Sequence, residues 1–435
     1  MKYKEICLVQ AVLLSLLVVL LACPAHTAAS EKIILKFSYA PFGFSADAER
    51  TFWSKYIKQF EKENPNIKVN MTWESWDNFH QKTHMAAETG RVPDLSYCSP
   101  ATNMPIAARG LVLQVDDVIK ALGGPQEFVE SNLAPFQLDG KTYGVPNCDN
   151  NIVLAYRKDI LKKFGFNAPP KTWDELVKIA KACTKNGVYG LGLFLGKTHD
   201  TRQVYEGMMW AAGGCEIEKN GDVVLDSPAN LTALKFYTDL YLKHKVVPPS
   251  AVDWKYGDNA NLIGSGQVAM TPIYGGYGTL IEEMFPKTYK EIGFIEMPSG
   301  PTGHSGSRSG VGAFFIFSKA QHPEEAKKFI LFLSTPKIHK EWCVISGNVS
   351  PFKAIANDPE LTKFEWYRAI ARQSPNAVQP GFNYGPHAKG LDVINGLHVM
   401  AEPVVGVISE GFSPEESLKR AHKHYARIVE DARKK

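Results

Sequence analysis

Aromatic and polar side chains gather in short segments that follow the predicted β-strands. Ligands of open α/β sheets lie outside the carboxyl ends of the strands, so these segments are placed to form a pocket. Flat Trp and Tyr rings pack against C–H faces, while Asn, Asp, Ser and Arg supply donors and acceptors for hydroxyl groups. The mixture predicts a pocket for a polyhydroxylated ligand. The segments are residues 39–44, 74–77, 99–103, 147–151, 274–277 and 305–309.

One stretch imitates a phosphate-binding loop. Gly190, Gly192 and Gly196 precede Lys197 and Thr198, but five or three residues separate the glycines where the motif requires four. We therefore interpret the stretch as a strand that ends in a turn. A serine hydrolase is equally unsupported, because the sequence contains no G-x-S-x-G nucleophile elbow.

Two histidines share one face of a predicted helix. His80 and His84 have the i, i+4 spacing of a zinc-binding helix, but Gln81 stands where a metalloprotease carries its glutamate base. No later cluster clearly offers a third ligand. We interpret both histidines as solvent-facing, and the sequence predicts neither a metal nor a cofactor.

The elements that position these segments alternate between strand and helix. The alternation predicts a parallel sheet with helices on both faces. Capping boxes at Thr172–Glu175 and Ser413–Glu416 begin later helices, and another helix runs from Pro323 to Leu333. Strands are predicted at 33–37, 67–71, 94–98, 188–195, 267–273 and 311–317, and the early helices at 46–63, 76–89 and 104–109.

The composition is that of a globular protein. The 435 residues are 44% hydrophobic and 22% charged, with a formal net charge of +4. This length exceeds what one core usually organises, so two lobes are expected. Because no low-complexity linker divides the chain, several short crossings should join the lobes and form a hinge. The near-neutral charge and the lack of a clustered basic face exclude nucleic acid as an expected partner.

Residues 1–29 have the pattern of a secretory signal peptide. Lys2 and Lys4 precede an apolar run over 11–21, and small residues follow at 27–29. The run is shorter than the about 20 apolar residues of a transmembrane helix. Alternatively, Leu20–Cys23 resembles a lipobox, in which lipidated Cys23 would hold the protein at the membrane. Both interpretations predict export, and we expect the soluble periplasmic form.

The seven cysteines do not form a recognisable site. The five beyond the leader are widely spaced, without a C-x-x-C pair or a metal pattern. We interpret them as buried small hydrophobic residues. One disulfide stays open as an alternative, because an oxidising compartment allows it.

Several stretches, in a constant order, resemble one protein family. The most specific is Gly140–Pro146, followed by Ala155–Asp159 and Pro170–Leu176. Over residues 31–430 the chain resembles the extracellular solute-binding proteins of ABC importers, from the carbohydrate-binding group that includes maltose-binding protein. The other stretches are 60–69, 93–95, 108–112, 266–270, 275–277, 322–330 and 347–351.

The resemblance implies a periplasmic-binding-protein fold, in which two α/β lobes joined by a multi-crossing hinge enclose a ligand cleft. It assigns residues 30–150 and 275–345 to the N-terminal lobe and residues 151–274 and 346–435 to the C-terminal lobe. It also implies a monomer that is not an enzyme. Such a protein closes over its ligand and delivers it to the transmembrane subunits of an ABC permease.

The resemblance also implies ligand contacts by position. Asn150 lies at the first crossing, Tyr277 matches an aromatic that stacks on sugar, and Arg308 faces the cleft. The segment 380–384 departs from the family's tryptophan arrangement, which leaves the ligand's length open. The candidate ligand-binding residues are Tyr39, Trp76, Asp77, Ser99, Asn150, Arg202, Gln203, Glu206, Trp210, Trp254, Tyr274, Tyr277, Arg308 and Tyr384.

The expected ligand is a mono- or oligosaccharide or a sugar alcohol. An anionic polyol such as a glycerol phosphate is an alternative, because the guanidinium groups of Arg202 and Arg308 suit phosphate or carboxylate. A periplasmic glycosidase is an alternative of another class, because carboxylates are plentiful, although no pair is indicated. A metal-binding receptor is the remaining alternative.

Overall fold

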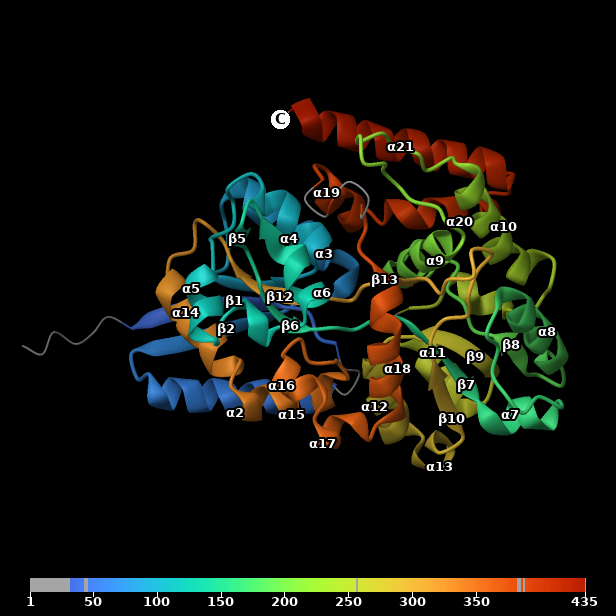
Figure 1. The fold of residues 1–435 in the computed structure, drawn as a ribbon, viewed down its shortest axis with the longest axis horizontal. Helices are drawn as coiled ribbons and strands as arrows, with labels where there is room; N and C mark the ends of the chain where they lie inside the picture. The colour runs from blue at the N-terminus through green and yellow to red at the C-terminus, as the bar shows by residue number, and fades with distance from the viewer. Residues whose placement is uncertain (1–31, 43–45, 256, 382–384, 386–387, 435) are drawn as a thin grey trace, which may run out of the picture.

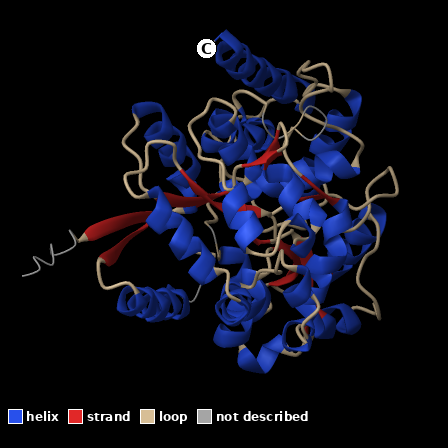
Figure 2. Ribbon diagram, turned by 60° about the vertical axis from the view of Figure 1, so that its left-hand side comes forward, coloured by secondary structure: helices blue, strands red, loops and turns tan. Residues whose placement is uncertain are grey.

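The computed structural model describes residues 32–42, 46–255, 257–381, 385 and 388–434 (Figure 1). The predicted leader with Cys23, and Tyr384 of the candidate site, lie outside these residues. The described elements form two α/β lobes, each built around its own sheet (Figures 1 and 2). Within the described ranges, no helix combines the length and apolar composition that a membrane crossing requires.

The first lobe contains a five-stranded sheet in the order β2-β1-β3-β12-β6. β1 (Ile33–Tyr39) pairs in parallel with β2 (Ile67–Trp73) and β3 (Leu95–Cys98). β12 (Gly312–Ile316) runs antiparallel to β3 and to β6 (Val145–Cys148). The other elements of this lobe are α2 (Ala46–Glu63), α3 (Trp76–Thr89), α4 (Pro100–Ala107), α5 (Asp116–Ala121), α6 (Glu130–Leu133), α14 (Pro323–Leu333), α15 (Pro336–Ser346), α16 (Lys353–Ala356), α17 (Pro359–Thr362), the short strands β4 (Gln137–Leu138) and β5 (Lys141–Thr142), and 3-10 turns at Pro125–Glu127 and Ala134–Phe136.

The second lobe contains a four-stranded sheet in the order β10-β7-β9-β8. β7 (Val153–Arg157) is antiparallel to β10 (Ile292–Ile295) and β9 (Val268–Ile273), and β8 (Tyr189–Leu191) is parallel to β9. Its helices are α7 (Lys158–Lys163), α8 (Trp173–Cys183), α9 (His199–Ala211), α10 (Pro228–Leu242), α11 (Asp258–Ser265), α12 (Gly276–Met284), α13 (Pro286–Tyr289), α18 (Glu365–Gln373), α20 (Glu402–Ile408) and α21 (Pro414–Lys434), with a 3-10 turn at Pro249–Val252.

The remaining elements lie between the lobes. β11 (Ser307–Arg308) pairs in parallel with β13 (Ala377–Val378). α19 (Leu391–Gly396) packs on α3 and α4 of the first lobe, although it follows second-lobe elements in the chain. Two 3-10 turns, Ser374–Asn376 and Val399–Ala401, flank this region.

The predicted parallel pairing is confirmed for β1, β2 and β3 and for β8 and β9, but each sheet also contains an antiparallel strand that was not predicted. A parallel pair follows from a strand–helix–strand crossover within one sheet. β12 instead enters the first sheet after the chain has left the second lobe, so no such crossover sets its direction. The strands also divide residues 275–345, which supply β10 to the second sheet and β12 to the first.

Short segments carry the chain between the lobes, as the absence of a linker predicted. Residues 149–152 join β6 to β7, and residues 309–311 join β11 to β12. Here backbone lies directly against backbone: a Cβ added to Gly310 would lie 1.9 Å from the carbonyl oxygen of Asn150. One added to Gly275 would lie 2.0 Å from that of Gly347. Only glycine fits at these positions, because any side chain would overlap the neighbouring backbone, and the crossing segments can therefore pack closely together.

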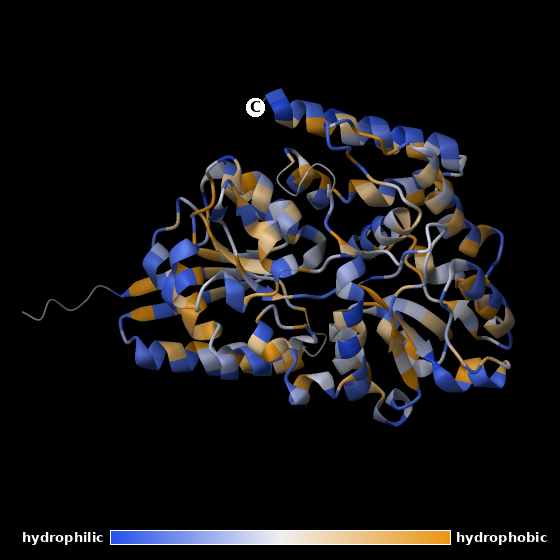
Figure 3. Ribbon diagram, in the orientation of Figure 1, coloured by the Kyte–Doolittle hydropathy of each residue, from blue (hydrophilic) through white to orange (hydrophobic). Residues whose placement is uncertain are grey.

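The interior of both lobes is apolar. Every residue of β3, β6, β9 and β12 is buried. α21, by contrast, is hydrophilic along most of its length (Figure 3) and buries a stripe at helical spacing that includes Leu418, Ala421 and Tyr425. Burial of these apolar faces is the main favourable term in folding.

Local signals in the sequence are confirmed where they concern helices. α2 and α14 have the predicted bounds. Thr172 Oγ1 accepts a hydrogen bond from the Glu175 backbone N–H at 3.2 Å, and Ser413 Oγ accepts one from Glu416 at 3.1 Å. The predicted burial of the cysteines is also confirmed, since those in the described residues are buried and form no disulfide with one another: Cys98, Cys148, Cys183, Cys215 and Cys343.

Candidate ligand-binding site

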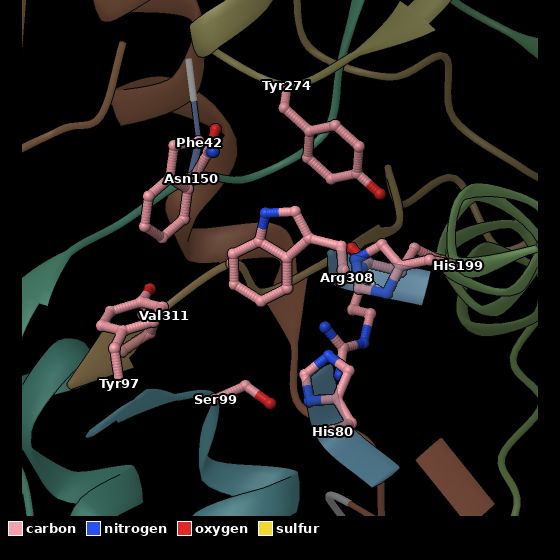
Figure 4. A pocket seen from close by; sticks show the side chains of 12 residues that line it. Phe42, His80, Tyr97, Ser99, Asn150, His199, Tyr274, Arg308 and Val311 are labelled. Carbon is pink, nitrogen blue, oxygen red and sulfur yellow. Dashed lines mark hydrogen bonds between the residues drawn. The ribbon is translucent and has the colours of Figure 1, made fainter. Parts of the chain in front are cut away.

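A cavity of about 50 Å³ lies where the two lobes and their crossings meet (Figure 4). Residues of both lobes contribute to its wall. The first lobe supplies Phe42, Trp76, His80, Tyr97 and Ser99, the second supplies His199, Gln203 and Tyr274, and the crossings supply Asn150, Arg308, Gly310 and Val311.

Strand ends position most of these residues. Trp76 begins α3 shortly after β2 ends, and Ser99 lies between β3 and α4. Tyr274 directly follows β9, and Asn150 lies just beyond β6. The Asn150 side-chain oxygen accepts a hydrogen bond from the Gly275 N–H at 2.8 Å, which fixes the orientation of its amide. The cavity therefore occupies the place predicted for ligands of α/β sheets.

Three flat rings form one wall of the cavity. The ring of His199 stacks on Trp76 at 5.8 Å and on His80 at 5.5 Å between centroids. The Trp76 indole N–H donates to the Pro41 carbonyl at 2.6 Å, which holds the ring in place. His80 and Trp76 belong to the first lobe and His199 to the second, so this stack spans the cleft.

Both imidazoles are held in the neutral form. Burial lowers the pKa of His80 and of His199 well below the ordinary value, and the positive charge of Arg202 lowers both further. His80 Nδ1 lies 2.9 Å from the Thr102 hydroxyl, so its other nitrogen, Nε2, is the atom left for a ligand. A neutral imidazole presents one donor and one acceptor, which suits a hydroxyl group.

A buried charge network lies at the second-lobe side of the cavity. Arg308 Nε lies 3.0 Å from Glu206 Oε2, and both side chains are at most 3% exposed. Arg202 Nη2 lies 3.0 Å from His199 Nδ1, and Arg202 Nη1 donates to the Asn395 side-chain oxygen. Burial and the charge of Arg308 lower the pKa of Arg202 to about 10. Burial raises the pKa of Glu206, and the two arginines oppose that rise.

Some polar atoms of the wall have no hydrogen-bond partner among the residues that the structure describes. They are the hydroxyl oxygen of Ser99, Nε2 of His80 and Nη2 of Arg308, and all three are buried. Figure 4 shows these three side chains close to one another in the pocket. A buried polar group without a partner costs about 1–3 kcal/mol. A ligand that pairs with all three would remove that cost.

The structure brings together part of the predicted set. Arg202 and Glu206 do not line the cavity, but they contact His199 and Arg308, which do. Asp77 belongs to α3, but its side chain, like Tyr384, is outside the described part. The predicted residues that line the cavity are Trp76, Ser99, Asn150, Gln203, Tyr274 and Arg308.

Four further predicted residues do not line the cavity. Tyr39 is fully buried, and its hydroxyl donates to Glu49 at 3.1 Å. Tyr277 stacks behind Tyr274 at 6.0 Å, and its hydroxyl accepts the Gly257 N–H at 3.2 Å. The indole N–H groups of Trp210 and Trp254 donate to Glu216 and Ser250. Each of these rings is held inside its own lobe by a contact that the spacing of residues does not reveal.

Other lining residues were not among the candidates. The solvent-facing interpretation of His80 is wrong: its side chain is buried between Trp76 and His199, because α3 faces the second lobe. His84 is half-buried against Asp392. The signal was present, since His80 lies one helical turn after Trp76, on the same face. The other residues of this kind are Phe42, Tyr97, His199, Gly310 and Val311.

Comparison with known proteins gives one consistent result. Residues 46–340 match the family model of the bacterial extracellular solute-binding proteins. A binding protein of Brucella abortus (strain 2308) is 31% identical over 350 residues, which cover 79% of this chain and 82% of that protein. The arabinooligosaccharide-binding protein of Bacillus subtilis (strain 168) is 25% identical over 317 residues, with 67% and 70% covered.

A solved structure agrees with the fold. The ABC transporter solute-binding protein of Thermotoga lettingae, bound with α-D-tagatose, superimposes with a TM-score of 0.80 at 26% identity. The superposition covers 91% of this chain and all of the other. This chain therefore shares the two-lobed fold of that solute-binding protein.

Proposed function

The chain belongs to the bacterial extracellular solute-binding protein family, the non-catalytic binding components of ABC importers, and on that premise we propose that its solute is a small neutral polyol. The class meant is a monosaccharide or a sugar alcohol. A longer saccharide is less well matched to the size of the cavity, and an anionic polyol is the second candidate.

The observation that carries the proposal is the set of unpartnered polar atoms in the cavity. Ser99 Oγ can donate and accept, His80 Nε2 does one or the other, and Arg308 Nη2 donates. A polyol presents hydroxyl groups that can take either role at neighbouring carbons. The rings of Trp76 and Tyr274 offer flat surfaces for its C–H face. A solute that lacks one matching hydroxyl would leave a buried atom unpaired, at about 1–3 kcal/mol.

The charges around the cavity favour a neutral solute. The guanidinium groups of Arg202 and Arg308 face the buried carboxylates of Glu206 and Asp200. These charges balance, and a neutral ligand leaves the balance in place. Burial and the neighbouring Glu206 raise the pKa of Glu216 to about 8, so this deeper carboxyl adds little charge at neutral pH.

The size of the cavity favours a short ligand. Its volume of about 50 Å³ admits roughly four water molecules, at roughly 10–15 Å³ for each. That space suits one sugar ring better than a chain of rings. The relatives named above support a carbohydrate, since one is described as bound to tagatose and another as binding arabinooligosaccharides.

The capture cycle follows from the placement of the wall. With the lobes apart, each half of the wall contacts solvent, and a solute can bind to either half. Closure buries the solute and adds the contacts of the other lobe, so the solute shifts the equilibrium towards the closed form. The closed monomer then presents a surface made of both lobes to the transmembrane subunits of the importer.

A ligand panel tests the proposal. Thermal unfolding should be measured with D-tagatose, L-arabinose, D-glucose, ribitol, maltose and glycerol 3-phosphate, because a ligand of the folded state alone raises the melting temperature. We expect a shift with a neutral monosaccharide or a sugar alcohol. The proposal fails if only maltose or only glycerol 3-phosphate shifts the transition, or if a chromogenic glycoside is hydrolysed.

A pair of tryptophan variants then locates the bound solute. Trp76→Ala should weaken binding by about ten-fold, since it removes one ring face of the wall. Trp254→Phe is the matched control, because this buried indole contacts Phe194 and Ser250 and does not line the cavity. Equal losses in both variants, measured by calorimetry, would place the solute elsewhere.

An anionic polyol is the second candidate, and one observation favours it. Arg308 Nη2 is buried and unpartnered, and a guanidinium group suits phosphate or carboxylate. An anion would bind less tightly as salt is added, whereas a neutral polyol would respond weakly to salt. A shift with glycerol 3-phosphate that disappears in Arg308→Ala would favour this candidate.

A further inference from the structure

α19 connects the two lobes across the cleft. On one side it packs on α3 and α4 of the first lobe. On the other side, Asn395 of α19 accepts a hydrogen bond from Arg202 of α9, in the second lobe. The chain continues from α19 through Val399–Ala401 into α20, which packs on α10 and α21 (Figure 1). α19 is thus tied by its chain to the second lobe and packed on the first.

One buried carboxylate joins α19 to the first lobe. Asp392 Oδ2 lies 2.5 Å from Nδ1 of His84 on α3 and 3.0 Å from Nη2 of Arg109, which follows α4. The Asp392 side chain is only 2% exposed. A carboxylate is buried to this extent only when it is paired.

The first lobe holds its half of this contact in place. Arg109 Nη1 also binds Glu88 of α3, and Arg109 Nε donates to the Pro105 carbonyl at 3.2 Å. The guanidinium group is therefore oriented before Asp392 arrives. When the lobes separate, water would replace the partners of Asp392, so the contact exists fully in the closed form alone.

The backbones of α3 and α19 also meet closely. A Cβ built on Gly396 would lie 3.4 Å from the Cβ of Gln81 and 3.2 Å from its Cα. Typical disulfides have Cβ atoms about 3.5–4.5 Å apart, so a small shift would allow a cysteine pair to bridge this point. The approach thus provides a place where closure can be measured chemically.

We propose that α19 is a latch: Asp392, held by His84 and Arg109, stabilises the closed form and raises solute affinity without touching the solute. The proposal rests on the proposed function only in that the lobes open and close. It does not depend on which solute is bound. Asp392 is a positioning residue, because it would act on the solute only through the fraction of protein that is closed. The apparent dissociation constant equals the intrinsic constant divided by the fraction of protein in the binding-competent form, so a larger closed fraction gives tighter binding.

The test uses the full chain without a solute. In Gln81→Cys/Gly396→Cys, the equilibrium of the disulfide in a glutathione buffer reports how often α3 and α19 are in contact, even when the closed form is rare. The single-cysteine variants are the blanks for the natural buried thiols. We expect the added Asp392→Asn change to lower the disulfide equilibrium constant by about ten-fold or more.

The matched control is a carboxylate with the same number of partners inside one lobe. Glu341 of α15 binds Lys55 and Tyr56 of α2, and both helices belong to the first lobe. Glu341→Gln in the same background should leave the disulfide equilibrium unchanged. Urea unfolding of the reduced variants checks that each is folded.

Each outcome decides the proposal. A lower equilibrium constant with Asp392→Asn, and not with Glu341→Gln, supports the latch, and Arg109→Gln should then act in the same direction. An unchanged constant with Asp392→Asn overturns it, as does a disulfide that fails to form in the parent pair. Because no solute is present, these results stand apart from any failure of the ligand panel.

Discussion

The aromatic core of the first lobe and the cavity wall contain the same kinds of residue but differ in what those residues contact. In the core, Tyr39 packs on Trp53 at 4.9 Å and on Phe37 at 5.6 Å between ring centroids, and its hydroxyl is paired with Glu49. In the wall, Trp76 stacks on His199 of the other lobe, and the polar atom His80 Nε2 has no hydrogen-bond partner in the described part of the chain.

The difference lies in what each region closes against. The rings of the core meet others of the same lobe, so the region is complete whenever the lobe is folded. The wall contains residues of both lobes, and on the proposed function its polar atoms pair with the solute when the lobes close. The contacts of the core are therefore complete once the lobe has folded, whereas we expect those of the wall to depend on the bound solute. The following predictions separate the two regions.

The largest expected effect is on the core. Phe37→Ala should lower the free energy of unfolding by about 3–5 kcal/mol, because it leaves a cavity in a fully buried cluster. Urea unfolding measures this loss. The affinity of the protein that stays folded should hardly change, and a strong loss of affinity would show that the core and the wall are coupled.

The next effect is on the wall. Arg308→Ala should weaken solute binding by about 100-fold, because it removes a ligand donor and leaves Glu206 buried without its partner. Calorimetry measures the affinity. The double variant Arg308→Ala/Glu206→Gln should regain stability, since no unpaired carboxylate remains, yet bind as weakly as the single variant. Recovered affinity would mean that Arg308 acts only by pairing Glu206.

Acid should weaken binding through the wall. Burial holds the pKa of His80 and His199 below the ordinary value of about 6.5. In acid, an imidazole that opening exposes becomes protonated, and this stabilises the open form relative to the closed form. Affinity should be constant above about pH 6.5 and fall below it, by roughly ten-fold at pH 5.5 for each imidazole that opening exposes. Calorimetry between pH 5 and 8 measures the slope.

A core histidine is the control for this pH dependence. Burial lowers the pKa of His339 to about 3, and its ring packs on Phe352 in the first lobe. His339 should make unfolding easier in acid without changing solute affinity. His80→Gln should flatten the pH profile of binding, and His339→Gln should not. A profile that is flat in the parent protein would contradict the stack across the cleft.

The smallest effect returns to the core. Tyr39→Phe removes one buried hydroxyl and should cost about 1–2 kcal/mol of stability, because Glu49 loses a donor. Solute affinity should not change, as Tyr39 does not line the cavity. Thermal unfolding and calorimetry measure the two quantities. A weaker affinity of Tyr39→Phe for the solute would show that Tyr39 contributes to ligand binding after all.

Local patterns predicted much of the fold. The bounds of α2 and α14 and the caps at Thr172 and Ser413 depend on residues within one or two turns, so the sequence contains them directly. The direction of β12 could not be predicted in this way, because it depends on a return from the other lobe. The strand ends located the cavity, although not which ring at each end would face it.

The site shows the same limit in single residues. Trp76 and Tyr39 both lie in the predicted segments, but only Trp76 faces the second lobe. His80 was predicted to face solvent, yet it is buried, because His199, which lies 119 positions further along the sequence, stacks on it. A contact between such distant residues leaves no periodic pattern in either segment.

The amino-acid order alone determined the helices, the alternation of strands, and the class of protein, because each is written in short-range spacing or in stretches shared with relatives. Tertiary structure alone decided which described polar atoms stay unpaired, that Arg308 is buried beside Glu206, and that Asp392 contacts His84 and Arg109. Those properties arise when surfaces from separate parts of the chain exclude water together, and burial of this kind is a property of the assembled lobes.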